Sequence, residues 1–77
     1  MSNAYDVTVT KSAGTPSGLR AARKLALGEA REAVSRGYTS GEIRVKYDTV
    51  VYVLATDGIH RLVKSPDGRT LSDRRIP

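Results

Sequence analysis

Three basic residues, Arg20, Lys24 and Arg31, lie at helical spacing in a stretch that has the pattern of an amphipathic helix. Positions i, i+4 and i+11 lie near one another on one face of a helix, so the three cations would share one side. Such a side is either a solvated face or a stripe that contacts the phosphates of a nucleic acid. Both interpretations stay open, and the three residues are the candidate nucleic-acid contacts of this chain.

The charge of the whole chain favours the same chemistry. Its 77 residues include 13 Lys and Arg against 8 Asp and Glu, a formal net charge of +5. A basic domain meets the first criterion for nucleic-acid binding. No specific module matches, because one long helix excludes a helix-turn-helix and the tyrosines are not clustered as in RNA-recognition strands. Binding would therefore depend on phosphates, tolerate many sequences and weaken in salt.

Residues that serve catalytic and metal sites are scarce. The chain has no Cys and one His, which excludes a disulfide framework, a Cys-based zinc site and a Cys nucleophile. His60 follows an Asp-Gly pair and has no neighbouring pattern of a base with a nucleophile. Glu29 and Glu32 are three residues apart without a third ligand type. We therefore expect no catalytic residue, no cofactor, no metal ion and no enzymatic activity.

The elements that must position these residues follow from periodicity and capping. Alternating polar and apolar residues over 5–10 predict a first strand. Thr15 can cap a helix whose first turn holds Pro16, and Gly37 can end that helix near Arg36. Strands are expected at 42–47, 50–55, 59–64 and 69–71. Turns are expected at Asp48-Thr49, at Asp57-Gly58, where Leu54 would pair with Arg61, and at Pro66-Asp67-Gly68.

This order of elements predicts an α+β fold. One helix would pack on an antiparallel sheet of four to five strands, in the order strand, helix and then three or four strands. Residues 1–77 would form a single domain, with residues 72–77 as a flexible tail.

Two apolar features raise the question of a partner. Small residues, Ala22, Ala26, Ala30 and Ala33, form a helical stripe that either lets the helix lie close to the sheet or serves self-association. The strand at 50–55 is apolar on both faces, so long side chains or a partner must cover the second face. A chain this short has few other means of stabilisation, which favours an interface and a homo-oligomer such as a dimer. The candidate interface residues are Leu25, Leu27, Val51 and Val53.

The strand–helix–meander order, small size and basic charge resemble small phage-encoded accessory proteins, including some anti-CRISPR inhibitors. The parts that carry this resemblance are the strand start at Ala4-Tyr5, the helix through Glu29-Ala30-Arg31 and the hairpin over 52–62. The resemblance implies a protein that acts by occupying the surface of a host protein.

The expected function is therefore that of a non-enzymatic binding module for a host protein, for itself or for both. Sequence-tolerant binding of nucleic acid is the alternative, and a structural role in a virion is a third possibility. Residues 1–10 lack the pattern of a signal peptide, and the longest apolar run, Val50–Ala55, is far shorter than the ~20 residues of a membrane span. We therefore expect a cytoplasmic protein without membrane contact.

Overall fold

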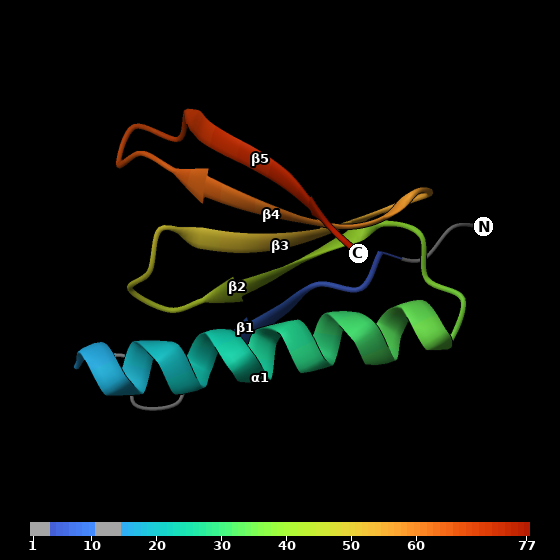
Figure 1. Ribbon diagram of the computed structural model, residues 1–77, viewed down its shortest axis with the longest axis horizontal. Coiled ribbons are helices and arrows are strands. Elements are labelled where there is room, and N and C mark those ends of the chain that lie inside the picture. Colours follow the sequence, from blue (N-terminus) through green and yellow to red (C-terminus); the bar gives the residue numbers. More distant parts are fainter. Residues whose placement is uncertain (1–3, 11–14) are drawn as a thin grey trace.

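The computed structural model describes residues 4–10 and 15–77. The fold class expected from the sequence is confirmed, because one helix packs on one face of a five-stranded sheet (Figure 1). The elements in chain order are β1 (Val7–Val9), α1 (Pro16–Ser35), β2 (Gly41–Val45), β3 (Val50–Ala55), β4 (Gly58–Lys64) and β5 (Thr70–Ile76).

The strands lie in the sheet in their chain order, β1-β2-β3-β4-β5. From β2 to β5 each strand pairs antiparallel with the next, whereas β1 pairs parallel with β2. The parallel pair follows from the connection, because α1 carries the chain back along the sheet before β2 begins. The sheet is therefore mixed and mostly antiparallel, not antiparallel throughout.

Both ends of α1 have the predicted caps. The Thr15 hydroxyl accepts the N–H of Gly18 at 3.0 Å, and Pro16 occupies the first turn. At the other end Gly37 has φ +93°, and the N–H of Tyr38 donates to the carbonyl of Ala33 at 3.1 Å. This is the left-handed termination that Gly favours, and it turns the chain toward β2.

The stripe of alanines on α1 is part of the hydrophobic core. All four alanines are fully buried, and α1 contacts β1, β2, β3 and β4. Because Ala is small, the helix lies close to the sheet. This confirms the first of the two interpretations of the stripe, close packing on the sheet. The sheet side of the core consists of Ile43, Val45, Val50, Tyr52, Leu54 and Ile59.

Two turns differ from the predictions. Leu54 pairs with Ile59, not with Arg61, because Gly58 already pairs with Ala55 and leaves Thr56-Asp57 as the loop. This shift of two residues preserves which side chains share a face. In the preceding hairpin the N–H of Asp48 donates to the carbonyl of Val45 at 3.1 Å, so the turn spans residues 46–47, not 48–49.

The expected tail at 72–77 is also corrected. Residues 70–76 form β5, which pairs with β4 along its length except for an irregularity at Val63/Lys64. Charged residues in this segment hide the alternation of a strand, and only Ile76, which packs against the core opposite Ile59, has the apolar character of a core residue. The pairing partner, not the local sequence, makes this segment a strand.

Candidate functional site

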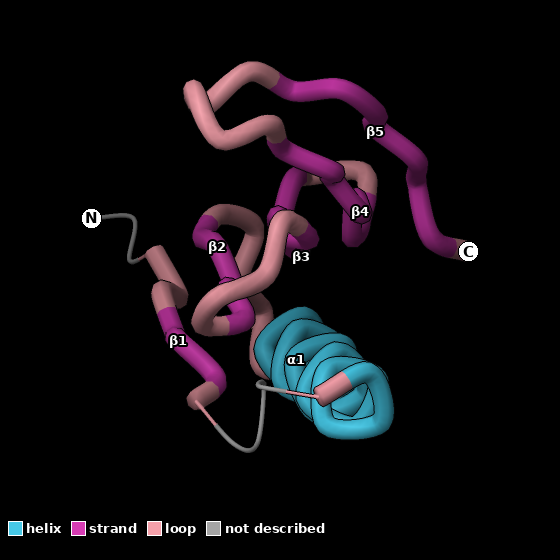
Figure 2. The backbone as a smooth tube through the Cα atoms, turned by 90° about the vertical axis from the view of Figure 1, so that its left-hand side faces the viewer, coloured by secondary structure: helices cyan, strands magenta, loops and turns pink. Residues whose placement is uncertain are grey.

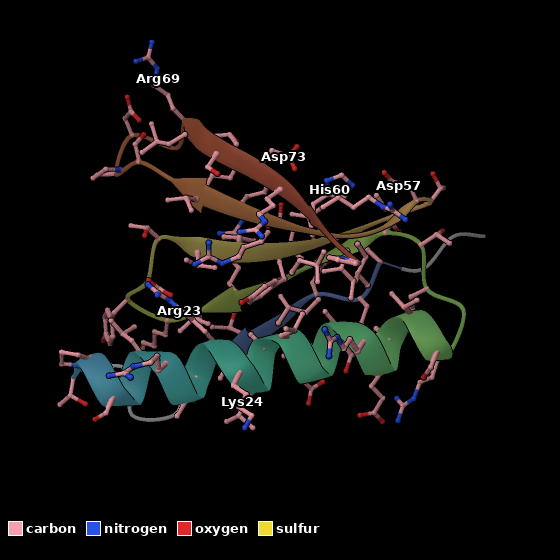
Figure 3. All side chains as sticks on the ribbon, viewed as in Figure 1. Arg23, Lys24, Asp57, His60, Arg69 and Asp73 are labelled. Atoms are coloured by element: carbon pink, nitrogen blue, oxygen red, sulfur yellow. The ribbon has the colours of Figure 1, made fainter. Side chains whose placement is uncertain are left out.

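The three predicted helix cations lie together on the exposed side of α1. Arg20, Lys24 and Arg31 are exposed, and none forms an ion pair within the described part of the chain. Figure 3 shows Lys24 pointing away from the sheet. Glu29 marks the side of the helix next to β1, because its carboxylate accepts the hydroxyl of Tyr5 at 2.6 Å. By helical periodicity Arg20 and Arg31 lie on the opposite side, away from β1.

Two further arginines, which the sequence did not single out as a pair, lie directly opposite each other on β4 and β5. Arg61 pairs in register with Arg74 on one side and with the buried Tyr52 on the other. Residues paired in this way share a face of the sheet, so both arginines lie on the same face as Tyr52, which is the face that α1 packs against. The helix contacts β4 but not β5. Neither arginine forms an ion pair with any described residue. Like charges in this position destabilise a sheet.

The helix cations and the strand pair border the same margin of the core. Leu27 lies on the same side of α1 as Arg20 and Arg31. It is partly buried against the core, as are Val63 of β4 and Ile76 of β5, the strands that carry Arg61 and Arg74. Figure 2 shows β1 and β5 at opposite edges of the sheet, with α1 below the strands that lie between them. We call the five cations at this margin the basic surface: Arg20, Lys24, Arg31, Arg61 and Arg74.

The one carboxylate that lies beside the basic surface, that of Asp48, has both of its oxygens hydrogen-bonded to Arg23. Asp48 accepts from Arg23 at 2.6 Å (Nε to Oδ2) and 2.8 Å (Nη2 to Oδ1), and its side chain is only 3% exposed. The Arg23 guanidinium holds the pKa of Asp48 below its ordinary value, so the pair stays ionised and neutral as a unit. The other carboxylates lie at β1 and β2, on the β1 side of α1, on the far sheet face or in the β4–β5 turn: Asp6, Glu29, Glu32, Glu42, Asp57, Asp67 and Asp73.

The candidate protein-interface residues do not come together. Val51 and Val53 lie on the sheet face without a helix, and Val51 is only 8% exposed because neighbouring side chains cover it. Leu27 packs against the core from α1. Leu25 is 46% exposed on the other flank of the helix, beside an open hollow of about 600 Å³. Of the four, Leu25 offers the most apolar surface.

His60 joins the β3–β4 turn to β5 on this second sheet face (Figure 3). Its Nδ1 lies 2.8 Å from Asp73 Oδ1, its Nε2 lies 2.9 Å from Asp57 Oδ1, and Arg75 Nε donates to the Asp57 carbonyl at 2.9 Å. The hydrogen bond to Asp57, and after it the one to Asp73, raises the pKa of His60 above its ordinary value. The same bond to His60 lowers the pKa of Asp57. Both ring nitrogens are occupied, so this histidine is structural. Asp73 could not be foreseen as a partner from a segment expected to be a tail.

The His60 cluster predicts a pH-dependent contribution to stability. Because the pKa of His60 is raised in the folded chain, its contribution is complete below the ordinary value of about 6.5 and is lost as the pH rises through the folded value. Thermal unfolding of the protein and of His60→Gln should therefore show a larger difference in Tm at acidic than at alkaline pH. An equal difference at both pH values would contradict the ion pairs.

Comparison of the chain with protein-family models, curated proteins and solved structures gives no match. Within residues 4–10 and 15–77, no group of three or more His, Cys, Asp or Glu side chains could hold a metal ion. In the same residues no helix has the length and apolar character to cross a membrane. The surface features of the fold are therefore the basis for assigning a function.

Proposed function

We propose that this chain is a small non-enzymatic module that binds nucleic acid through its phosphates. The observation that supports this best is the pair of arginines at 61 and 74, which face each other on adjacent strands without a carboxylate partner among the described residues. Arg61 is half-buried on β4, and Arg74 is exposed on β5, which the helix does not contact. In the free protein this pair is repulsive. A phosphate bound between the two guanidinium groups would remove the repulsion and accept charge-assisted hydrogen bonds from both.

The dimensions of the basic surface fit a run of phosphates. Arg20 and Arg31 are eleven residues apart on one helix, a rise of about 16 Å. Phosphates along one strand of a duplex are spaced by about 3.4 Å of helix axis, so this length faces about five of them. The cations project from a helix and from paired strands, so binding requires little ordering of the backbone.

Binding to a host protein or to a second copy stays a prediction from the sequence. Leu25 is the residue that favours it, because 46% of this residue is exposed. A single exposed leucine is common on soluble proteins. The five clustered cations are the more specific feature, and for this reason we place nucleic-acid binding first.

The proposal predicts a steep dependence of binding on salt. For three to five neutralised phosphates, the logarithm of the association constant should fall against the logarithm of salt concentration with a slope of about −2.7 to −4.5 for a duplex and about −2.1 to −3.5 for a single strand. Between 50 and 200 mM salt this corresponds to a loss of affinity of roughly 40- to 500-fold for the duplex and roughly 20- to 130-fold for the single strand. Fluorescence anisotropy of a labelled DNA of about 20 nucleotides, single-stranded and as a duplex, measures both quantities.

Two results would contradict the proposal. One is the absence of binding to either DNA at 50 mM salt, and the other is an affinity that salt does not change. Either result would leave protein binding through Leu25 as the function to test next, by measuring the solution mass over a range of concentrations.

A further inference from the structure

Tyr47, in the turn between β2 and β3, has an unusual conformation and almost no packing. Its φ is +66°, and 83% of the residue is exposed. A bulky side chain rarely adopts the left-handed region, which Gly or Asn occupy at lower cost. The ring contributes little to the core, so burial does not compensate for this conformation.

The residues around Tyr47 hold the turn in place from both sides. The N–H of Lys46 donates to the carbonyl of Val9 at 2.9 Å, and the N–H of Asp48 closes the turn onto β2. Asp48 is held by both of its bonds to Arg23, and the carbonyl of Thr49 accepts the N–H of Lys64 at 2.8 Å. The aromatic ring is therefore presented to solvent on a fixed support.

This turn lies next to the basic surface. Its anchor on α1, Arg23, is one helical turn from Arg20. Lys46 Nζ lies 5.1 Å from the centre of the Tyr47 ring. On the other side of the turn an open hollow of about 570 Å³ is lined in part by Arg44, Lys46 and Lys64. An exposed aromatic ring among cations is the arrangement that stacks unpaired bases in proteins that bind single strands.

We infer that the nucleic acid bound by this chain is single-stranded, with one base stacked on Tyr47 while the neighbouring phosphates lie along the basic surface. This inference rests on the proposed function and specifies its ligand. A duplex would contact the same cations, but its bases are stacked within the helix and present no open face to the ring. Tyr47 would then add affinity for the single strand only.

The test compares two substitutions at this position. Tyr47→Asn removes the ring and suits the left-handed backbone, so the fold should keep its Tm or gain slightly. It should weaken binding to single-stranded DNA of about 12 nucleotides by roughly tenfold or more, because stacking is lost. Binding to a duplex of the same sequence should change by less than about twofold. Tyr47→Phe should bind both DNAs as the native chain does, because its ring can still stack.

Tyr47→Trp supplies a direct readout, because the chain contains no other Trp. A base stacked on the indole should quench its emission when single-stranded DNA is added. Inorganic polyphosphate, which has the charge but no bases, should bind the basic surface and leave the emission nearly unchanged.

The outcomes separate this inference from the function on which it rests. If Tyr47→Asn binds single-stranded DNA as tightly as the native chain, the stacking role is wrong, while salt-sensitive binding would still support the proposed function. If polyphosphate and single-stranded DNA quench the indole emission of the Tyr47→Trp variant equally, the inference is likewise overturned. If the native chain binds neither DNA at low salt, the proposed function fails, and the inference fails with it.

Discussion

Replacing Arg61 and Arg74 together by glutamate is expected to lower the affinity for DNA about 100-fold at low salt. Two phosphate contacts are lost and two repulsions are added, a change of about 2.7 kcal/mol, since about 1.4 kcal/mol is a factor of ten. The fold should tolerate the change, because two glutamates reproduce a like-charge pair where the arginines already repel each other. Anisotropy measures the affinity, and thermal unfolding reports whether the stability is unchanged.

A matched control separates a local site from a general effect of charge. Arg36→Glu with Arg75→Glu changes the net charge by the same amount at the C-terminal end of α1 and on the far sheet face. This double variant should lose less than about tenfold in affinity, because it affects the DNA through screened, long-range repulsion. It also removes the contacts of Arg36 with Glu32 and of Arg75 with Asp57, so thermal unfolding must show that the variant is still folded. Equal losses in the two double variants would show that net charge alone governs binding.

The single variant Arg61→Glu adds a second comparison to this experiment. A carboxylate in place of Arg61 would face Arg74 as an opposite charge, which should stabilise the sheet by about 0.2–1 kcal/mol. The same change should weaken DNA binding. A variant that gains stability while it loses affinity would indicate that the arginine pair serves a ligand and not the fold. A loss of both would contradict the placement of the two side chains.

Gly41→Ala is expected to destabilise the fold by about 2–4 kcal/mol, the largest effect of any single substitution considered. Gly41 begins β2 with φ +134°, and a Cβ there would lie 2.6 Å from the backbone nitrogen of Tyr5 and closer still to its carbonyl oxygen. Both the backbone angle and the contact with a rigid main chain oppose a side chain. Since the N–H of Tyr5 bonds to Ser40, the entry to β1 should separate from the sheet first.

Gly28→Ala is the control for this prediction. Gly28 lies within α1, and a Cβ there would meet no atom within 4 Å. Ala should therefore stabilise the protein by about 0.5–1 kcal/mol through its helix propensity. Urea unfolding measures both variants. A Gly41→Ala protein as stable as the native chain would show that β1 does not lie against residue 41 as described.

Local patterns were sufficient for the helix and for most of the strands. Thr15, Pro16 and Gly37 act through contacts within one turn, so a short stretch of sequence determines where α1 begins and ends. The buried alanine stripe was also visible, because a helix places every third or fourth residue on one face. The start of β5 was predicted as a short strand at 69–71, but its continuation over residues 72–76 was missed. Those residues pair with β4 and do not alternate in polarity, so the neighbouring strand determines their structure.

Composition and periodicity are enough to establish that this protein is small, basic and built from one helix and a sheet, and that Arg20, Lys24 and Arg31 share a helix face. Tertiary contacts are needed to bring Arg61 and Arg74 to the same margin, since register and strand order set which side chains meet across a sheet. They also impose the conformation of Tyr47, through hydrogen bonds that reach the turn from β1, α1 and β4. These contacts join residues that are far apart in the chain, so a pattern of neighbouring residues in the sequence cannot predict them.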